Sequence, residues 1–334
     1  VYACIDPILR FLQVPGEVWD GLRIYLLIVF AGILATSLYN FYACLLRALG
    51  NSVAPLIFLA VSAVLNIGLD LLLVLVFPMG IAGAALATVA AQYVSAIGMA
   101  LYVRIRRPEL RPRFRGIRFD RTMLGEIVHL SSLTCVQQSV MNFGILMVQG
   151  LINSFGPVVM AAFAAAVKID TLAYLPVQDF GNAYSTFVAQ NFGAGCKERI
   201  RRGSRIAMGM SLGFCVAISA LVCLFAAPLM RIFVQAQETA VIASGVQYLR
   251  IEGAFYAGIG CLFLLYGYFR AVKRPGMSVV LTVISLGTRV ALAYALAAVM
   301  GETGIWLAIP IGWALADAVG LWHIRRDMAK PGNL

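Results

Sequence analysis

Apolar runs of about 20 residues, separated by short polar connections, fill almost the whole chain. A run of that length allows an α-helix to cross the hydrocarbon core of a membrane. Nine such runs predict nine membrane-spanning helices, at residues 23–46, 53–77, 81–103, 126–155, 158–190, 206–227, 248–269, 276–299 and 305–324. Residues 1–12 read as the end of one further helix. The pattern therefore predicts an all-α, polytopic membrane protein.

Short motifs of the first half return in the second half at nearly constant spacing. Three dipeptides are repeated after 223, 223 and 221 residues, namely Tyr25-Leu26 as Tyr248-Leu249, Arg47-Ala48 as Arg270-Ala271, and Met79-Gly80 as Met300-Gly301. Duplicated sets of apolar helices are the signature of secondary transporters whose two halves move around a central site. The second copy has about 100 more residues ahead of the shared motifs, which is enough for three spans. We therefore read the chain as a fragment that lacks three preceding helices.

Composition supports a membrane protein. Apolar residues make up 61% of the chain and charged residues 12%, and the mean hydropathy is +0.89. A soluble domain would carry roughly a quarter charged residues, so this class is excluded. The seven Cys are scattered without a C-x-x-C pair or a nearby His cluster, which predicts neither a disulfide framework nor a metal site.

The net charge of +11 is distributed unevenly. Of the 26 Lys and Arg, 20 lie in alternate connections, and the opposite set of connections contains Arg231 alone. Positive residues stay on the cytoplasmic side, so we expect a cytoplasmic C-terminus and a cytoplasmic Arg-rich linker at 104–121. The basic charge is then explained by membrane topology and anionic headgroups, and nucleic-acid binding is not expected.

Ionisable residues at membrane depth are the strongest candidates for function, because burying them in hydrocarbon is costly. Asp70 lies nine residues before the outer turn at Met79, and Thr88 lies nine residues after it. Both are therefore about 13 Å from the turn, near the membrane midplane, with Asn66 one helical turn from Asp70. These three side chains suit Na⁺ coordination or a proton-carrying carboxylate. The alternative is that Asn66 and Thr88 hydrogen-bond a purely structural Asp70.

Several motifs together resemble the multidrug and toxic compound extrusion (MATE) family. They are LRALGNS at 46–52, PL at 55–56, LNIGLD at 65–70, MGIAGAA at 79–85, AQNFGAG at 189–195 and YLRI at 248–251. The resemblance covers essentially the whole chain. It implies a twelve-helix, two-lobed antiporter that expels cationic and amphipathic drugs in exchange for H⁺ or Na⁺. The chain would then comprise a partial N-lobe (1–103, with helices 4–6), the linker 104–121 and a C-lobe (122–334, helices 7–12).

The resemblance also implies a place for the coupling cation. In the prokaryotic DinF-like branch, an Asn and an Asp four residues apart and a Thr on the next helix form the N-lobe cation site. Asn66, Asp70 and Thr88 occupy the matching positions. The NorM-like branch uses acidic residues in the C-lobe instead. The corresponding stretches here, 137–142 and 258–260, contain no carboxylate, which argues for coupling in the N-lobe.

The second half has its own polar residues at mid-depth. They are Gln137, Gln138, Asn142, Lys168, Asp170, Arg289 and Asp317, which we expect to form a polar network or to line a substrate cavity. Arg289 paired with Asp317 or Asp170 is the favoured arrangement, because unpaired charge in a membrane is costly. The alternative is that Lys168, Asp170 and Arg289 line the central cleft and bind an acidic part of the substrate. Glu252 is expected near the outer end of its helix, without a role.

Three classes of function follow. The first is a monomeric, cation-coupled exporter of small organic molecules in a bacterial or archaeal cytoplasmic membrane, with H⁺ or Na⁺ as coupling ion and no cofactor. The second is a flippase of lipid-linked or amphipathic metabolites with a related fold. The third is a membrane enzyme. His129 and His323 lie near predicted helix ends, and no nucleophile–base or metal-binding pattern supports catalysis.

Overall fold

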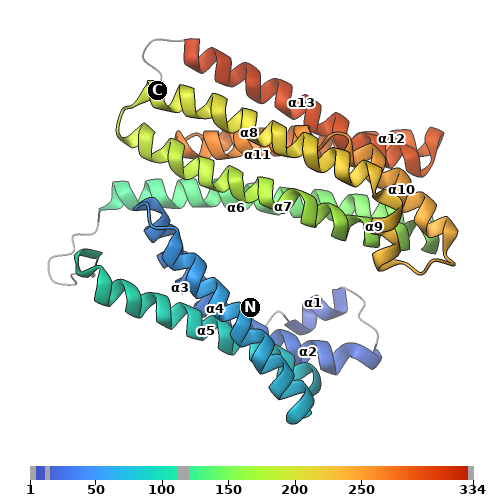
Figure 1. Ribbon diagram of the computed structural model, residues 1–334, viewed down its shortest axis with the longest axis horizontal. Coiled ribbons are helices and arrows are strands. Elements are labelled where there is room, and N and C mark those ends of the chain that lie inside the picture. Colours follow the sequence, from blue (N-terminus) through green and yellow to red (C-terminus); the bar gives the residue numbers. More distant parts are fainter. Residues whose placement is uncertain (1–4, 12–15, 111–119, 330–334) are drawn as a thin grey trace. The chain divides into compact units, whose positions relative to one another are not determined.

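The computed structural model describes residues 5–11, 16–110 and 120–329, and every element in these ranges is a helix. The chain divides into two compact units, residues 1–119 and 120–334. Residues 111–119 of the predicted linker lie outside the described residues. Figure 1 shows the helices of both units, and each unit is described by itself.

Unit 1 is built around its longest helix. Its elements are α1 (Ile5–Phe11), α2 (Gly16–Ala31), α3 (Ile33–Ala48), α4 (Val53–Asp70), the π-helix η2 (Leu71–Val76), α5 (Gly80–Arg106) and the 3₁₀ turn η3 (Pro108–Leu110). Helix α5 packs against α2, α3 and α4. Its packed face carries Gly83, Ala87 and Ala91, all buried, and such small residues let helices approach closely in lipid.

Unit 2 contains the main core of the protein. Its helices are α6 (Arg121–Asn153), α7 (Pro157–Gly193), α8 (Lys197–Leu224), α9 (Ala226–Phe233), α10 (Thr239–Gly253), α11 (Tyr256–Ala271), α12 (Pro275–Met300) and α13 (Glu302–Ala329). Asp120 begins α6 by accepting hydrogen bonds from the backbone N–H groups of Thr122 and Met123. Helix α7 packs against α8, α10 and α11, and α12 packs against α6 and α13.

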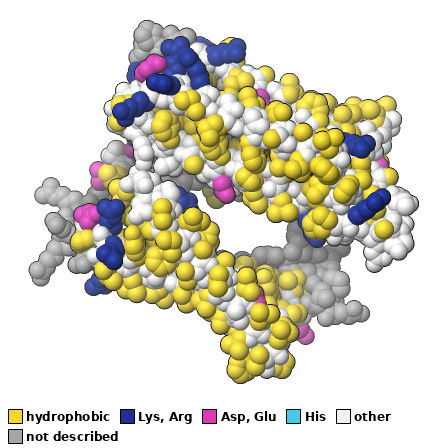
Figure 2. All heavy atoms as spheres, in the orientation of Figure 1, with side chains coloured by type: hydrophobic (Ala, Val, Ile, Leu, Met, Phe, Trp, Pro, Cys, Tyr) yellow, Lys and Arg dark blue, Asp and Glu magenta, His cyan; other side chains and the backbone are white. Residues whose placement is uncertain are grey.

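The number of predicted membrane spans is confirmed. In the described part of the chain, eight helical segments are long and apolar enough to cross a membrane, and α10 with α11 makes a ninth if this bent pair is one span. Large apolar side chains face outward along these helices, for example Leu34, Val64 and Val299, which are 74%, 72% and 84% exposed. Figure 2 shows hydrophobic side chains, in yellow, covering much of the visible face of each unit. Such a surface fits lipid rather than water.

The prediction of one continuous helix over 248–269 is wrong. Helix α10 ends at Gly253, α11 begins at Tyr256, and the two are bent by 52°. Glycine at 253 and 258 weakens the helix at this point, because glycine loses the most backbone entropy on ordering. Because α10 begins at Thr239, Glu252 lies at the break between two helices and not, as expected, near the start of one helix.

Glycines at helix-packing spacing do not always mark a contact. Gly209 and Gly213 have the spacing of a close helix contact, yet both are exposed on α8. A side-chain carbon added at either position would meet nothing within 4 Å. Helix α8 packs instead through residues on its other face, among them Ala207, Ser211 and Cys215.

The sequence repeat is reproduced in the backbone. Gly50 and Lys273, 223 residues apart, both have left-handed φ angles, of 82° and 60°. Each lies at the end of a helix. In both copies the next residue donates its backbone N–H to the carbonyl five residues earlier, at 2.8 Å: Asn51 to Leu46 and Arg274 to Phe269. This is the helix-ending motif that a left-handed residue permits.

The following hairpin is repeated as well. Gly80 and Gly301 open the second helix of each hairpin with φ of 55° and 61°. A side-chain carbon on Gly83 would lie 2.9 Å from the Leu73 carbonyl oxygen, and one on Gly304 would lie 2.5 Å from that of Leu296. Leu73 and Leu296 are again 223 residues apart, so each half brings its two helices together in the same way.

Candidate functional site

In unit 1, the predicted cation-binding residues lie on two packed helices. Asn66 and Asp70 are one turn apart on α4, and Thr88 is on α5. The Asn66 amide Nδ2 donates a hydrogen bond of 3.4 Å to Thr88 Oγ1, which in turn donates to the Ala84 carbonyl at 3.0 Å. The hydrogen bond between α4 and α5 confirms that Asn66 and Thr88 meet at one depth.

Asp70 is placed beside this pair but is not hydrogen-bonded to it. Its Oδ1 atom is shielded from solvent and has no hydrogen-bond partner among the described residues. The structure therefore does not support the alternative, in which Asn66 and Thr88 donate hydrogen bonds to an Asp70 with a purely structural role. A buried carboxylate oxygen without a donor is unfavourable, and a bound proton or cation would relieve this cost.

The chain after Asp70 has an unusual helical geometry. Residues Leu71–Val76 form a π-helix, in which the Phe77 N–H bonds the Leu72 carbonyl at 3.0 Å. Segments of π-helix are rare and often mark functional sites, because the wider turn changes the direction of side chains and leaves local carbonyls poorly paired. The apolar run at 71–76 carries no sequence signal for this change, and the hydrophobic pattern predicts an ordinary helix there.

Unit 2 contains a second carboxyl site, centred on Asp170 of α7. Asp170 is 2% exposed. Its Oδ2 accepts a hydrogen bond of 2.6 Å from the Tyr248 hydroxyl on α10, and its Oδ1 accepts one from the Tyr256 hydroxyl on α11. Asp170 thus joins α7 to both sides of the break between α10 and α11.

A second carboxyl group lies against the first. Glu252, one turn after Tyr248, is 5% exposed and neighbours both Asp170 and the Tyr248 hydroxyl. Its Oε2 atom has no hydrogen-bond partner in the described ranges. Two adjacent carboxylates repel each other, so a shared proton or a cation between them lowers the free energy of the site. Unit 2 therefore does contain buried acidic residues, which coupling of the NorM-like kind requires. They lie outside the stretches 137–142 and 258–260 that were expected to carry them.

Other contacts fix α10 in place. The Ser244 hydroxyl donates to Glu302 Oε2 at 2.9 Å, and the Gln247 amide donates to Thr303 Oγ1 at 2.8 Å, which ties α10 to the start of α13. The Tyr248 ring packs edge-on against Trp306, with centroids 4.9 Å apart. These contacts orient the Tyr248 hydroxyl towards Asp170.

The expected ion pair of Arg289 is wrong. Among the side chains that the structure describes, no carboxylate oxygen lies within 4 Å of the Arg289 guanidinium. Both oxygens of Asp170 are occupied by tyrosine hydroxyls, and Asp317 lies beside Cys261 and Gly258 of α11. Arg289 acts on Asp170 and Glu252 at longer range, through its charge.

The remaining polar residues do not form one network. Lys168 is exposed, with its ammonium 5.8 Å from the Phe233 ring centroid, and it lies on a different face of α7 from buried Asp170. Gln138 and Asn142 are exposed on α6, whereas Gln137 is buried. Sequence reasoning gave no role to Tyr248, Tyr256 or Glu252. The duplicated Tyr-Leu dipeptide marks Tyr248 alone, and Glu252 stood out only as an ionisable residue in an apolar helix. In the described ranges, no group of three or more His, Cys, Asp or Glu side chains is placed to hold a metal ion.

The chain matches known proteins in both sequence and fold. The sequence model of the MatE family matches residues 1–72 and 133–295. The chain is 31% identical over 330 residues to the probable multidrug resistance protein YpnP of Bacillus subtilis, covering 98% of this chain and 73% of that protein. It is 26% identical over 306 residues to the probable multidrug resistance protein NorM of Thermotoga maritima, covering 90% of this chain and 65% of that one.

The fold matches solved structures as well. A crystal structure of a mutant of the Vibrio cholerae MATE transporter VcmN aligns with a TM-score of 0.92 at 22% identity, over 99% of this chain and 75% of that one. At 22% identity, this similarity establishes the fold alone. Together with the family match and the YpnP relative, it identifies the chain as a multi-pass membrane protein of the MATE family.

Proposed function

We propose that this protein exports cationic and amphipathic organic compounds in exchange for H⁺ or Na⁺, by alternating access. The observation that carries the coupling is the shielded Asp70 Oδ1 without a donor, next to the amide and hydroxyl of Asn66 and Thr88. Membership in the MATE family and relatives named as probable multidrug resistance proteins support the cargo class. The inner membrane, a cytoplasmic C-terminus and a monomeric state belong to the same proposal.

Coupling requires that the cation favour one conformation of the carrier over the other. A proton or Na⁺ at Asp70 neutralises a carboxylate held at mid-depth between α4 and α5. The π-helix η2 follows α4 directly, and its residues Leu71–Val76 could convert to an α-helix that continues α4. Cation binding would therefore change the packing of this hairpin, and the cargo would be released as the cation is taken up.

The direct test is Asp70→Asn in the full-length protein. In proteoliposomes with an imposed H⁺ or Na⁺ gradient, we expect gradient-driven export of a fluorescent lipophilic cation to be lost in this variant, with unchanged membrane insertion. Asp20→Asn, at an exposed position on α2, is the matched control and should export normally. Undiminished export by Asp70→Asn would overturn the site assignment.

Two alternatives have an observation in their favour. The unpartnered Glu252 Oε2 beside Asp170 favours coupling in unit 2 instead, and Glu252→Gln rather than Asp70→Asn would then abolish export. Arg289 without a carboxylate contact favours an anionic amphipathic cargo, as in a flippase. Competition of dye export by simple organic cations supports the drug exporter, whereas competition by acidic amphipaths alone supports the flippase.

A further inference from the structure

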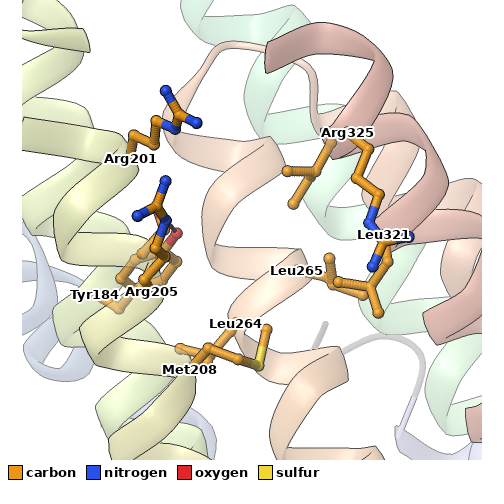
Figure 3. Close-up of a pocket in the computed structure, with 10 residues that line it drawn as sticks. Tyr184, Arg201, Arg205, Met208, Leu264, Leu265, Leu321 and Arg325 are labelled. Atoms are coloured by element: carbon orange, nitrogen blue, oxygen red, sulfur yellow. Dashed lines mark hydrogen bonds between the residues drawn. The ribbon is translucent and has the colours of Figure 1, made fainter. Parts of the chain in front are cut away.

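A cavity of about 660 Å³ opens in unit 2, and neither Asp170 nor Glu252 lines it. Figure 3 shows its walls, with Arg201 and Arg205 on α8, Arg325 and Leu321 on α13, and Leu264 and Leu265 on α11 behind them. Helix α11 packs against both α8 and α13. The cavity therefore lies at the end of the unit where α8 begins and α13 ends, and Figure 2 shows Lys and Arg side chains gathered there.

The upper part of the cavity is strongly basic. Arg201 and Arg205 are one turn apart on the same face of α8, and Arg325 faces them from α13. Within the described part of the chain, none of the three makes an ion pair. A Tyr184 hydroxyl paired with Ser204 Oγ at 2.6 Å adds polar groups to the wall. Arg201 and Arg205 on one wall and Arg325 on the facing wall, without acidic partners, favour an anionic ligand.

The deeper part is apolar. Met208 follows Arg205 by one turn on α8, Leu321 precedes Arg325 by one turn on α13, and Leu264 and Leu265 form the floor. From Arg201 to Met208 the helix rises about 10 Å. The polar headgroup layer on each side of a bilayer is about 5–8 Å thick. The change from arginine to apolar residues thus occurs over the depth at which a bilayer changes from headgroup to acyl chain.

We propose that this cavity binds one anionic phospholipid of the cytoplasmic leaflet. Its anionic headgroup lies between Arg201 and Arg205 on one wall and Arg325 on the other, and its acyl chains lie along Met208, Leu264 and Leu321. Basic pockets between membrane helices on the cytoplasmic side are suited to such headgroups. A free phosphate ion would use the arginines alone and leave the apolar floor in contact with water, so the lining favours a lipid.

The bound lipid would join α8 to α13 through its headgroup. Its removal leaves the arginines of both walls without a counter-charge, and like charges repel. We therefore expect the lipid to stabilise the cytoplasmic end of unit 2, independently of the cargo and of the coupling cation.

The experiment is native mass spectrometry of the full-length protein, titrated with phosphatidylglycerol, phosphatidylcholine or inorganic phosphate. We expect one tightly retained phosphatidylglycerol, binding at least tenfold tighter than phosphatidylcholine, and no displacement by millimolar phosphate. The double variant Arg205→Gln/Arg325→Gln should weaken that binding at least tenfold. Arg199→Gln/Arg202→Gln also removes two positive charges, both from α8, but these residues line a neighbouring groove, so this variant should retain the lipid.

Variants that fail to fold are recognised by their thermal unfolding in detergent. Met208→Trp provides an independent test, because it fills the apolar floor and keeps all three arginines. It should also weaken phosphatidylglycerol binding. Equal binding of the two lipids, full displacement by phosphate, or an equal loss in the Arg199→Gln/Arg202→Gln control would overturn the proposal.

Discussion

The Asn66 amide donates a 3.4 Å hydrogen bond to the Thr88 hydroxyl, and this contact joins α4 to α5 one turn from Asp70. We predict that Thr88→Val, which removes the hydroxyl and keeps the shape, weakens the apparent affinity for the coupling cation about threefold to tenfold. The reason is the loss of an oxygen ligand and of a hydrogen bond that contributes about 0.5–1.5 kcal/mol. The measurement is cargo export as a function of H⁺ or Na⁺ concentration in proteoliposomes.

Two variants control for this change. Thr88→Ser keeps the hydroxyl and should behave like the natural protein. Thr134→Val removes a hydroxyl that donates to the carbonyl four residues earlier on α6, as Thr88 does on α5, but Thr134 accepts no hydrogen bond from another helix of the described chain. An unchanged cation dependence in Thr88→Val, or an equal change in Thr134→Val, would show that Thr88 is not a ligand.

The general architecture was predictable because long apolar runs mark the membrane spans, and short motifs at the turns mark the repeat. Met79-Gly80 and Met300-Gly301 mark equivalent turns in the structure, and both glycines have positive φ. Local breaks were not predictable. The π-helix at 71–76 and the bend after Gly253 lie inside apolar sequence, where hydrophobicity alone does not distinguish helix types.

The polar contacts of unit 2 show the same limit. Arg289 and Asp317 are at matching depth by residue count, which predicts a pair, yet depth does not specify the direction of a side chain. Asp170 finds its donors on Tyr248 and Tyr256, two aromatic residues that an apolar span readily contains. Contacts between residues 78 and 86 positions apart in the sequence are set by how the helices pack.

The tyrosine donors to Asp170 should matter for stability. We predict that Tyr248→Phe and Tyr256→Phe each lower the free energy of unfolding by about 1–3 kcal/mol, because a buried carboxyl group then loses a donor. Tyr294→Phe, at an exposed position on α12, should change it little. The measurement is thermal unfolding in detergent, and melting temperatures equal to that of Tyr294→Phe would contradict the proposed role. The double variant should lose less than the sum of the two, because both tyrosines serve one carboxyl group.

The helix end at Gly50 offers a test of the repeated backbone geometry. Gly50→Ala places a side chain at φ 82°, and we predict a loss of about 1–2 kcal/mol. Gly68→Ala is the matched control on α4, where a side-chain carbon would meet nothing within 4 Å. It should gain up to about 1 kcal/mol, because alanine favours a helix. Equal stability of the two variants would mean that the turn at Gly50 relaxes to another conformation.

The central claim is that Asp70 exchanges a cation for cargo, and the most direct measurement is cation release when cargo binds. Purified full-length protein in weak buffer is mixed with a lipophilic cation, and released H⁺ is followed with a pH indicator or released Na⁺ with a radioactive tracer. We predict release by the natural protein and by Glu252→Gln, and none by Asp70→Asn. Release by Asp70→Asn equal to that of the natural protein, or its loss in Glu252→Gln alone, would contradict the account.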